Sequence, residues 1–207
     1  MAVYRLHRSR AKLGLQDHIR FDSRAFPLEL INKQATPKRI LDAEIPVVGS
    51  LEPSAGWQVW QRHPSEWPVT TLLALEAIEA AKEQGLQASE TLDLALRVAL
   101  FAHSRTISMR HEILAVAADC DGVDKDALKE ALIEGRARPA IEVNLQISQS
   151  DLVEGSPHLF LPDGTDVHNP GVEHHWEGDA GGGFPVVDND MPDVYDTLLR
   201  RAAAKAS

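Results

Sequence analysis

Residues 154–165 combine turn signals with the polar groups of a functional loop. A short apolar run of strand length, residues 158–161, lies at the centre of this stretch. Turn-forming residues flank the run on both sides, and they are Gly155 and Pro157 before it and Pro162, Asp163 and Gly164 after it. The stretch therefore predicts a loop, a strand and a hairpin turn, with Ser156 and Pro157 at the point where the loop meets the strand.

The segment 168–176 contains His168, His174 and His175, and the carboxylates Asp163 and Asp166 lie nearby in the sequence. These residue types suit zinc or another transition metal, and His168 and His174 could close around one ion. The adjacent His174 and His175 point in different directions on a strand or a helix, however, and the spacing matches no closed zinc motif. We therefore predict surface histidines in a loop, and we assign neither a metal nor a cofactor.

Cys120 is the only cysteine of the 207 residues. A single cysteine forms no intrachain disulfide and no Cys-x-x-Cys redox pair, so a cytoplasmic location is the default expectation. It follows an alanine-rich run at the predicted end of a helix. We interpret it as a small, partly buried structural thiol and assign no catalytic residue.

Charge and hydropathy exclude several kinds of partner. The net charge of −10 argues against nucleic acid and anionic membranes, because both require a basic surface. No apolar run approaches the roughly 20 residues of a membrane span, and no apolar signal-peptide core follows the basic first dozen residues. The length suits a single core with an insertion.

Periodicity predicts helices separated from a few strands. Residues 2–13 form a basic helix, and residues 18–26 alternate loosely as a strand that stops at Pro27. Five helices follow, beginning at Pro68, Glu90 (with Ser89 as a cap), Ser108, Asp124 and Pro139. Residues 178–183 form a flexible glycine-rich loop, and residues 192–205 form a closing helix.

The proline-rich connection before these helices contains Trp57, Trp60 and Trp67. Their rings could form an aromatic lip for a peptide or small ligand, or could pack under a loop and cover the core. Large aromatic side chains supply much of the buried area of any core, so we favour packing.

Two separated segments resemble the DsbA-like branch of the thioredoxin fold. One is the Gly-Ser-Pro, apolar strand and Pro-Asp-Gly of residues 154–165, and the other is the Phe-Pro-Leu segment within residues 24–32. The resemblance implies an α/β, thioredoxin-like fold with an all-helical insertion of about five helices and without its N-terminal strand. Residues 1–31 and 153–207 would form the core, and residues 32–152 the connection and insertion. It also implies a cis Ser156–Pro157 bond and substrate binding by Ser156 and Pro157.

The resemblance leaves the activity open, because the first helix has no Cys-x-x-Cys at its start. The chain would be a DsbA-like thiol-disulfide oxidoreductase family member that lacks its redox cysteines. Alternatives are a redox-inactive binding protein that uses the cis-proline groove, and a glutathione-dependent isomerase or kappa-type transferase, for which Ser9 lies too far along the helix. The implied partners are a protein thiol or disulfide, or a small thiol. We also expect a further strand and a Cys-x-x-Cys upstream of Met1 in the natural protein.

Overall fold

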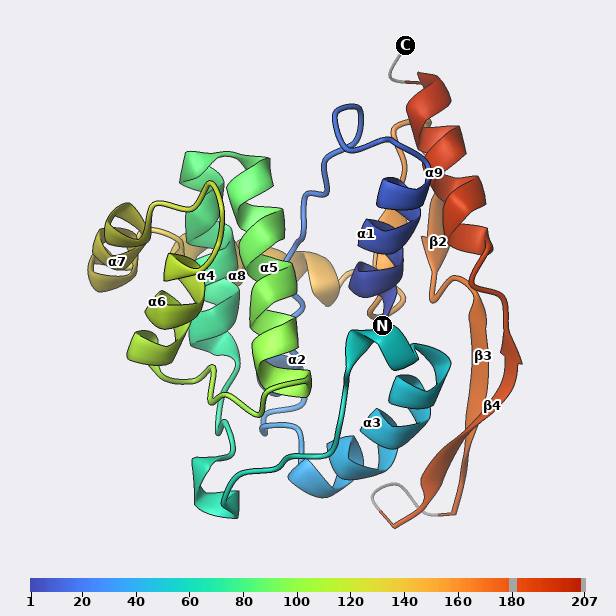
Figure 1. Cartoon of the computed structure of the whole chain (residues 1–207), viewed down its shortest axis with the longest axis horizontal. Coiled ribbons are helices and arrows are strands. Elements are labelled where there is room, and N and C mark those ends of the chain that lie inside the picture. Colours follow the sequence, from blue (N-terminus) through green and yellow to red (C-terminus); the bar gives the residue numbers. More distant parts are fainter. Residues whose placement is uncertain (179–181, 206–207) are drawn as a thin grey trace.

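The computed structural model describes residues 1–178 and 182–205, and this part of the chain is mostly helical (Figure 1). Its α-helices are α1 (Ala2–Lys12), α2 (Leu28–Ile31), α3 (Lys38–Leu51), α4 (Leu72–Ala81), α5 (Leu86–Phe101), α6 (Arg110–Ala118), α7 (Lys125–Glu134), α8 (Arg138–Ser148) and α9 (Val194–Lys205). Short 3₁₀ turns lie at Pro53–Ala55, Pro64–Glu66 and Lys82–Gln84. No helix within the described ranges is both long and apolar enough to cross a membrane.

The strands form two separate antiparallel hairpins. Strands β1 (His158–Phe160) and β2 (Asp166–His168) make the first, and β3 (Val172–Glu177) and β4 (Phe184–Asp190) make the second. The predicted thioredoxin-like sheet is therefore absent from residues 1–178 and 182–205. The second hairpin was not predicted, because its strand β3 contains His174 and His175, which we expected in a loop. Part of the predicted glycine-rich loop, residues 179–181, lies outside the described residues.

The five predicted helices are present as α4 to α8. Helices α4 to α7 share one apolar core, which Ala137 joins immediately before α8. Local signals explain the agreement best at α7. The Asp124 carboxylate accepts from the N–H groups of Asp126 and Ala127, and Gly135 ends the helix with φ +68°. The predicted cap at Ser89 is wrong, because α5 begins at Leu86 and the Ser89 hydroxyl donates to the Ile78 carbonyl instead.

The predicted strand at residues 18–26 is also wrong, since this segment runs without a paired strand. Its main-chain donors bind side chains of the neighbouring helices. The Phe21 N–H donates to Glu90 of α5 at 3.0 Å, and the Ala25 N–H donates to Glu79 of α4 at 3.2 Å. Both carboxylates are buried, and they accept the main-chain hydrogen bonds that a neighbouring strand would otherwise accept.

Helix α3 lies within the proline-rich connection, for which the sequence analysis predicted no helix. Pro46 is inside the helix, and Ile45 is its buried residue. Figure 1 shows α3 alongside the β3–β4 hairpin. This packing supplies tertiary support that the sequence pattern does not reveal, which explains how the helix accommodates an interior proline.

The tryptophans of this connection pack within the protein, which favours the packing interpretation rather than the aromatic lip. Trp60 is 8% exposed and belongs to the core of α4 to α7, with its ring edge-on to Trp67 at 5.2 Å between centroids. Trp57 is partly buried between the rings of Tyr4 and Phe101. These rings therefore join α1, the connection and α5.

A second core joins the two ends of the described chain. Helices α1 and α9 pack together (Figure 1), with Leu6, Ile19, Tyr195 and Leu199 buried between them and Leu159 of β1 against them. The division of the chain into residues 1–31 with 153–207 and residues 32–152 stays a prediction.

Buried charge fixes α1 against α3 and β4. The Arg5 side chain is fully buried, and its Nε donates to Glu52 Oε1 at 2.6 Å. Its two terminal nitrogens donate to the two oxygens of Asp190 at 2.6 and 2.9 Å. Glu52 also binds Arg8. One arginine therefore joins three elements that lie far apart in the sequence.

Candidate functional site

The loop before β1 has the geometry that the sequence predicted. The Ser156–Pro157 peptide bond is cis, which confirms that expectation. Ser156 is exposed and Pro157 is half-buried. The strand begins at the next residue, His158, so Ser156 lies beside the start of β1.

The register of the hairpin determines which main-chain groups of β1 are already paired. His158 lies opposite His168, and Phe160 lies opposite Asp166. The bonds that flank this pairing run from the Asn169 N–H to the Pro157 carbonyl and from the Leu161 N–H to the Thr165 carbonyl, each 2.8 Å. Because main-chain direction alternates along a strand, these bonds direct the polar groups of Pro157, Leu159 and Leu161 toward β2.

The main-chain groups of His158 and Phe160 consequently point toward the other edge of β1. Their N–H groups have no hydrogen-bond acceptor within the part of the chain that the structure describes. The Phe160 side chain is 61% exposed at the same place. The outer edge of β1 therefore offers unpaired main-chain donors beside an exposed aromatic ring.

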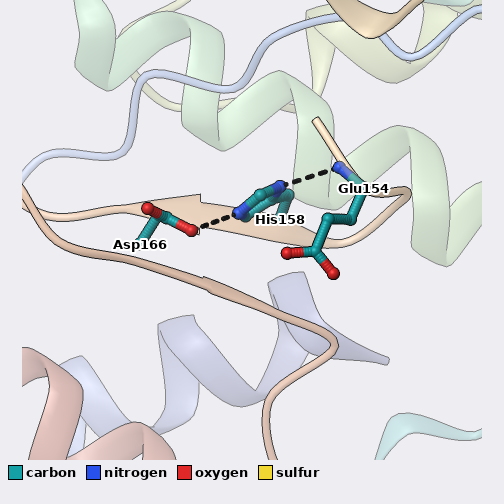
Figure 2. A group of neighbouring side chains, drawn as sticks. All are labelled: Glu154, His158 and Asp166. Atoms are coloured by element: carbon teal, nitrogen blue, oxygen red, sulfur yellow. Dashed lines mark hydrogen bonds and ion pairs between the residues drawn. The ribbon is translucent and has the colours of Figure 1, made fainter. Parts of the chain in front are cut away.

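The His158 ring connects this edge to the loop and to β2 (Figure 2). Nδ1 accepts from the Glu154 N–H at 3.2 Å, and Nε2 lies 2.8 Å from Asp166 Oδ1. The side chain is only 3% exposed and stacks on Phe160 with 4.5 Å between ring centroids. Since Nδ1 accepts a hydrogen bond, the neutral ring carries its proton on Nε2 and donates it to Asp166.

A nitrogen of His158 and carboxylate oxygens of Glu154 and Asp166 all lie within 4.8 Å of one another, which is a possible set of metal ligands. The tautomer argues against that role. A metal on Nε2 needs the proton on Nδ1, where it would face the Glu154 N–H donor. The structure instead favours a ring that uses both nitrogens to hold protein groups.

The metal pair that the sequence suggested is not brought together as a site. His168 is on β2, with Nδ1 3.7 Å from the Glu154 carboxylate, whereas His174 is on β3 in the other hairpin. Among the described residues, no group of three close metal ligands includes either histidine. The sequence analysis missed Glu154 and His158. The register of the hairpin places residues 158, 166 and 168 on one face, but that register comes from the coordinates, and no signal in the sequence places Glu154 beside them.

Cys120 lies away from this hairpin, just beyond the end of α6. Its thiol donates to the Val116 carbonyl at 3.3 Å. Burial, together with Asp119 and Asp121, raises the pKa of the thiol. Cys120 is partly buried, as the sequence interpretation expected, and its surroundings disfavour the reactive thiolate.

No protein-family model, curated protein or solved structure matches this chain.

Proposed function

We propose that this protein is a DsbA-related binding protein that takes an extended polypeptide segment at Ser156, Pro157 and the outer edge of β1. The observation that carries the proposal is the pair of N–H groups of His158 and Phe160, which point away from β2 and have no acceptor among the described residues. An extended chain that adds to a free strand edge bonds through its own main chain to such groups.

Neighbouring side chains suit the same ligand. Phe160 is exposed and supplies an apolar contact, and Ser156 is exposed immediately before the strand. The resemblance of residues 24–32 and 154–165 to DsbA-like proteins supports a polypeptide rather than a metabolite as the ligand. The proposal does not depend on a thioredoxin-like sheet, which residues 1–178 and 182–205 lack.

A binding role is favoured over thiol-disulfide exchange because the residues of this chain place no thiol at the loop. Cys120 is its single cysteine, and that thiol is bonded within α6. A ligand that contains a thiol or disulfide would bind without reacting with a cysteine of this chain. We expect no acceleration of insulin disulfide reduction by dithiothreitol, and an accelerated rate would favour the oxidoreductase alternative.

The glutathione-dependent alternative requires an accessible hydroxyl. Ser9, the residue considered for this role, is 4% exposed on α1. Retention of the protein on immobilised glutathione, with elution by free glutathione, would favour this alternative over polypeptide binding.

The direct test uses a fluorescein-labelled octapeptide of alternating threonine and valine residues, with anisotropy as the readout. We expect saturable binding. Two matched peptides carry N-methyl groups on alternate amides, each along a different edge of the extended octapeptide. Comparing them separates main-chain pairing from apolar adsorption. One methylated version should bind as well as the parent and the other should not, because a single edge of the ligand faces β1. Equal binding by both methylated versions would overturn the proposal.

Two variants at one position sharpen the test. Phe160→Ala keeps the outward N–H and removes the ring, whereas Phe160→Pro removes both and leaves the bonds to β2 in place. A net hydrogen bond contributes about 0.5–1.5 kcal/mol, so Phe160→Pro should bind the octapeptide about 2- to 13-fold more weakly than Phe160→Ala. Equal affinities of the two variants, with the hairpin intact by NMR, would contradict the assignment of this edge.

A further inference from the structure

The loop before β1 has few main-chain hydrogen bonds of its own. Within residues 154–156, the Glu154 N–H is the donor with an acceptor, and that acceptor is Nδ1 of His158. Gly155 and Ser156 have no main-chain hydrogen bond among the described residues. The hydrogen bond from Glu154 to His158 therefore closes the loop of residues 154–158, which contains both Ser156 and Pro157.

The other ring nitrogen anchors this closure to the hairpin. Nε2 of His158 lies 2.8 Å from Asp166 Oδ1 on β2, and Figure 2 shows the ring between Glu154 and Asp166. The ring is 3% exposed and stacked on Phe160, so its rotation is restricted. Because Asp166 accepts the proton of Nε2, it keeps Nδ1 free to accept from Glu154.

Close packing of His168 restricts the loop from the same side. A Cβ on Gly155 would lie 2.7 Å from His168 Nε2, so a larger residue here would displace the end of the His168 side chain. The rings of His158 and His168 lie 5.9 Å apart, edge to face. Two histidines that face each other across the hairpin thus both contact Glu154: His158 accepts from its N–H, and His168 Nδ1 lies 3.7 Å from its carboxylate.

We infer that His158 is a positioning residue: its neutral Nε2–H tautomer, oriented by Asp166, holds the main chain of Glu154 and thereby presents Ser156 and the outer edge of β1 to the bound polypeptide. The inference rests on the proposed binding function and adds the residue that sets the conformation of its loop. The imidazole of His158 does not touch the ligand, since both its ring nitrogens bind protein groups, whereas the main-chain N–H of the same residue is one of the two donors to the ligand.

The variants follow from the donor and acceptor that the ring supplies. His158→Phe keeps an aromatic ring for Phe160 and removes both hydrogen bonds. His158→Gln retains one acceptor and one donor, so it is the conservative replacement. On β2, Asp166→Ala removes the acceptor that orients the ring, and Asp166→Asn keeps an oxygen there.

The first measurement does not depend on any ligand. Two-dimensional ¹H–¹⁵N spectra of the imidazole should show the Nε2–H tautomer for His158. Amide exchange at Glu154, whose N–H donates to His158, should accelerate about 2- to 13-fold in His158→Phe and in Asp166→Ala, which corresponds to the loss of one hydrogen bond. His158→Gln and Asp166→Asn should stay within about twofold of the unmodified protein, less than one lost hydrogen bond. A proton on Nδ1, or unchanged exchange in both disruptive variants, would overturn the inference.

The second measurement uses the fluorescein-labelled octapeptide. Its affinity should fall in His158→Phe by the same factor as the loop exchange rises, and His158→Gln should restore it. If the unmodified protein binds no octapeptide while the exchange results hold, the binding function fails and the hold of His158 on the loop is supported. If the octapeptide binds equally to His158→Phe and His158→Gln, the positioning role is overturned and the binding function stands. Should His158→Phe fail to fold, the Asp166 pair decides the same question.

Discussion

Replacement of Arg5 by methionine tests the buried charge network that joins α1, α3 and β4. Methionine keeps the apolar stem and removes the guanidinium, which leaves Glu52 almost wholly buried, at 1% exposure, with the half-exposed Arg8 as its remaining partner. Removing one partner of a buried ion pair costs about 3–5 kcal/mol, because the other charge stays desolvated. For a chain of this length each kcal/mol shifts the melting temperature by about 2–4 °C, so we expect a loss of about 6–20 °C.

Urea unfolding followed by circular dichroism measures the loss directly. Arg24→Met is the matched control: Arg24 is 64% exposed in its pair with Asp22, and such a pair contributes about 0–1 kcal/mol. The double variant Arg5→Met, Glu52→Gln should regain part of the stability, because it removes the uncompensated charge. Two results would refute the reasoning: Arg5→Met as stable as Arg24→Met, or a double variant no more stable than Arg5→Met alone.

Three further predictions concern single groups. Cys120→Ala should change the free energy of unfolding by about 1 kcal/mol or less and leave octapeptide binding unchanged, since the thiol is half-buried and distant from the hairpin; a loss of binding in a folded variant would contradict this. Hydrogen bonds from Thr165, with Arg201 nearby, lower the pKa of Asp163 from 3.8 to about 2, so its stabilising effect is full above pH 4 and is lost as the pH falls through about 2. The difference in melting temperature between the unmodified protein and Asp163→Asn should therefore vanish near pH 2, and a constant difference would show that the carboxylate charge is not responsible. Zinc titration by calorimetry should give the same affinity for the unmodified protein and His158→Phe, whereas tenfold weaker binding by the variant would reassign His158 as a ligand.

Sequence patterns predicted the elements whose signals are local. Asp124 and Gly135 delimit α7 through hydrogen bonds and dihedral angles within the helix itself, and the turn before Thr165 produces the β1–β2 hairpin. The predicted strand at residues 18–26 failed because its acceptors, Glu79 and Glu90, lie more than fifty residues away in the sequence. No local pattern distinguishes a segment bound by side chains from one bound by a strand.

The candidate site was predictable in part for the same reason. Ser156 and Pro157 stand in a recognisable turn, so their place beside a strand followed from the sequence. The contact of His158 with Asp166 depends on the register of the hairpin, and the bond from Glu154 depends on the orientation of one ring. Both require coordinates, because a single-residue shift in register would place the two side chains on opposite faces.

The segment held by Glu79 and Glu90 has a consequence for how the sequence can vary. Phe21 and Ala25 offer main-chain donors, which every residue except proline provides, and the two acceptors are fixed on α4 and α5. The amino acids of residues 18–26 can therefore be substituted without loss of these two hydrogen bonds, provided that the packing contacts of each side chain are kept. The spacing of four residues is not free to change, since one inserted or deleted residue would move a donor away from its carboxylate. Selection on this part of the chain should act on its length more than on its composition.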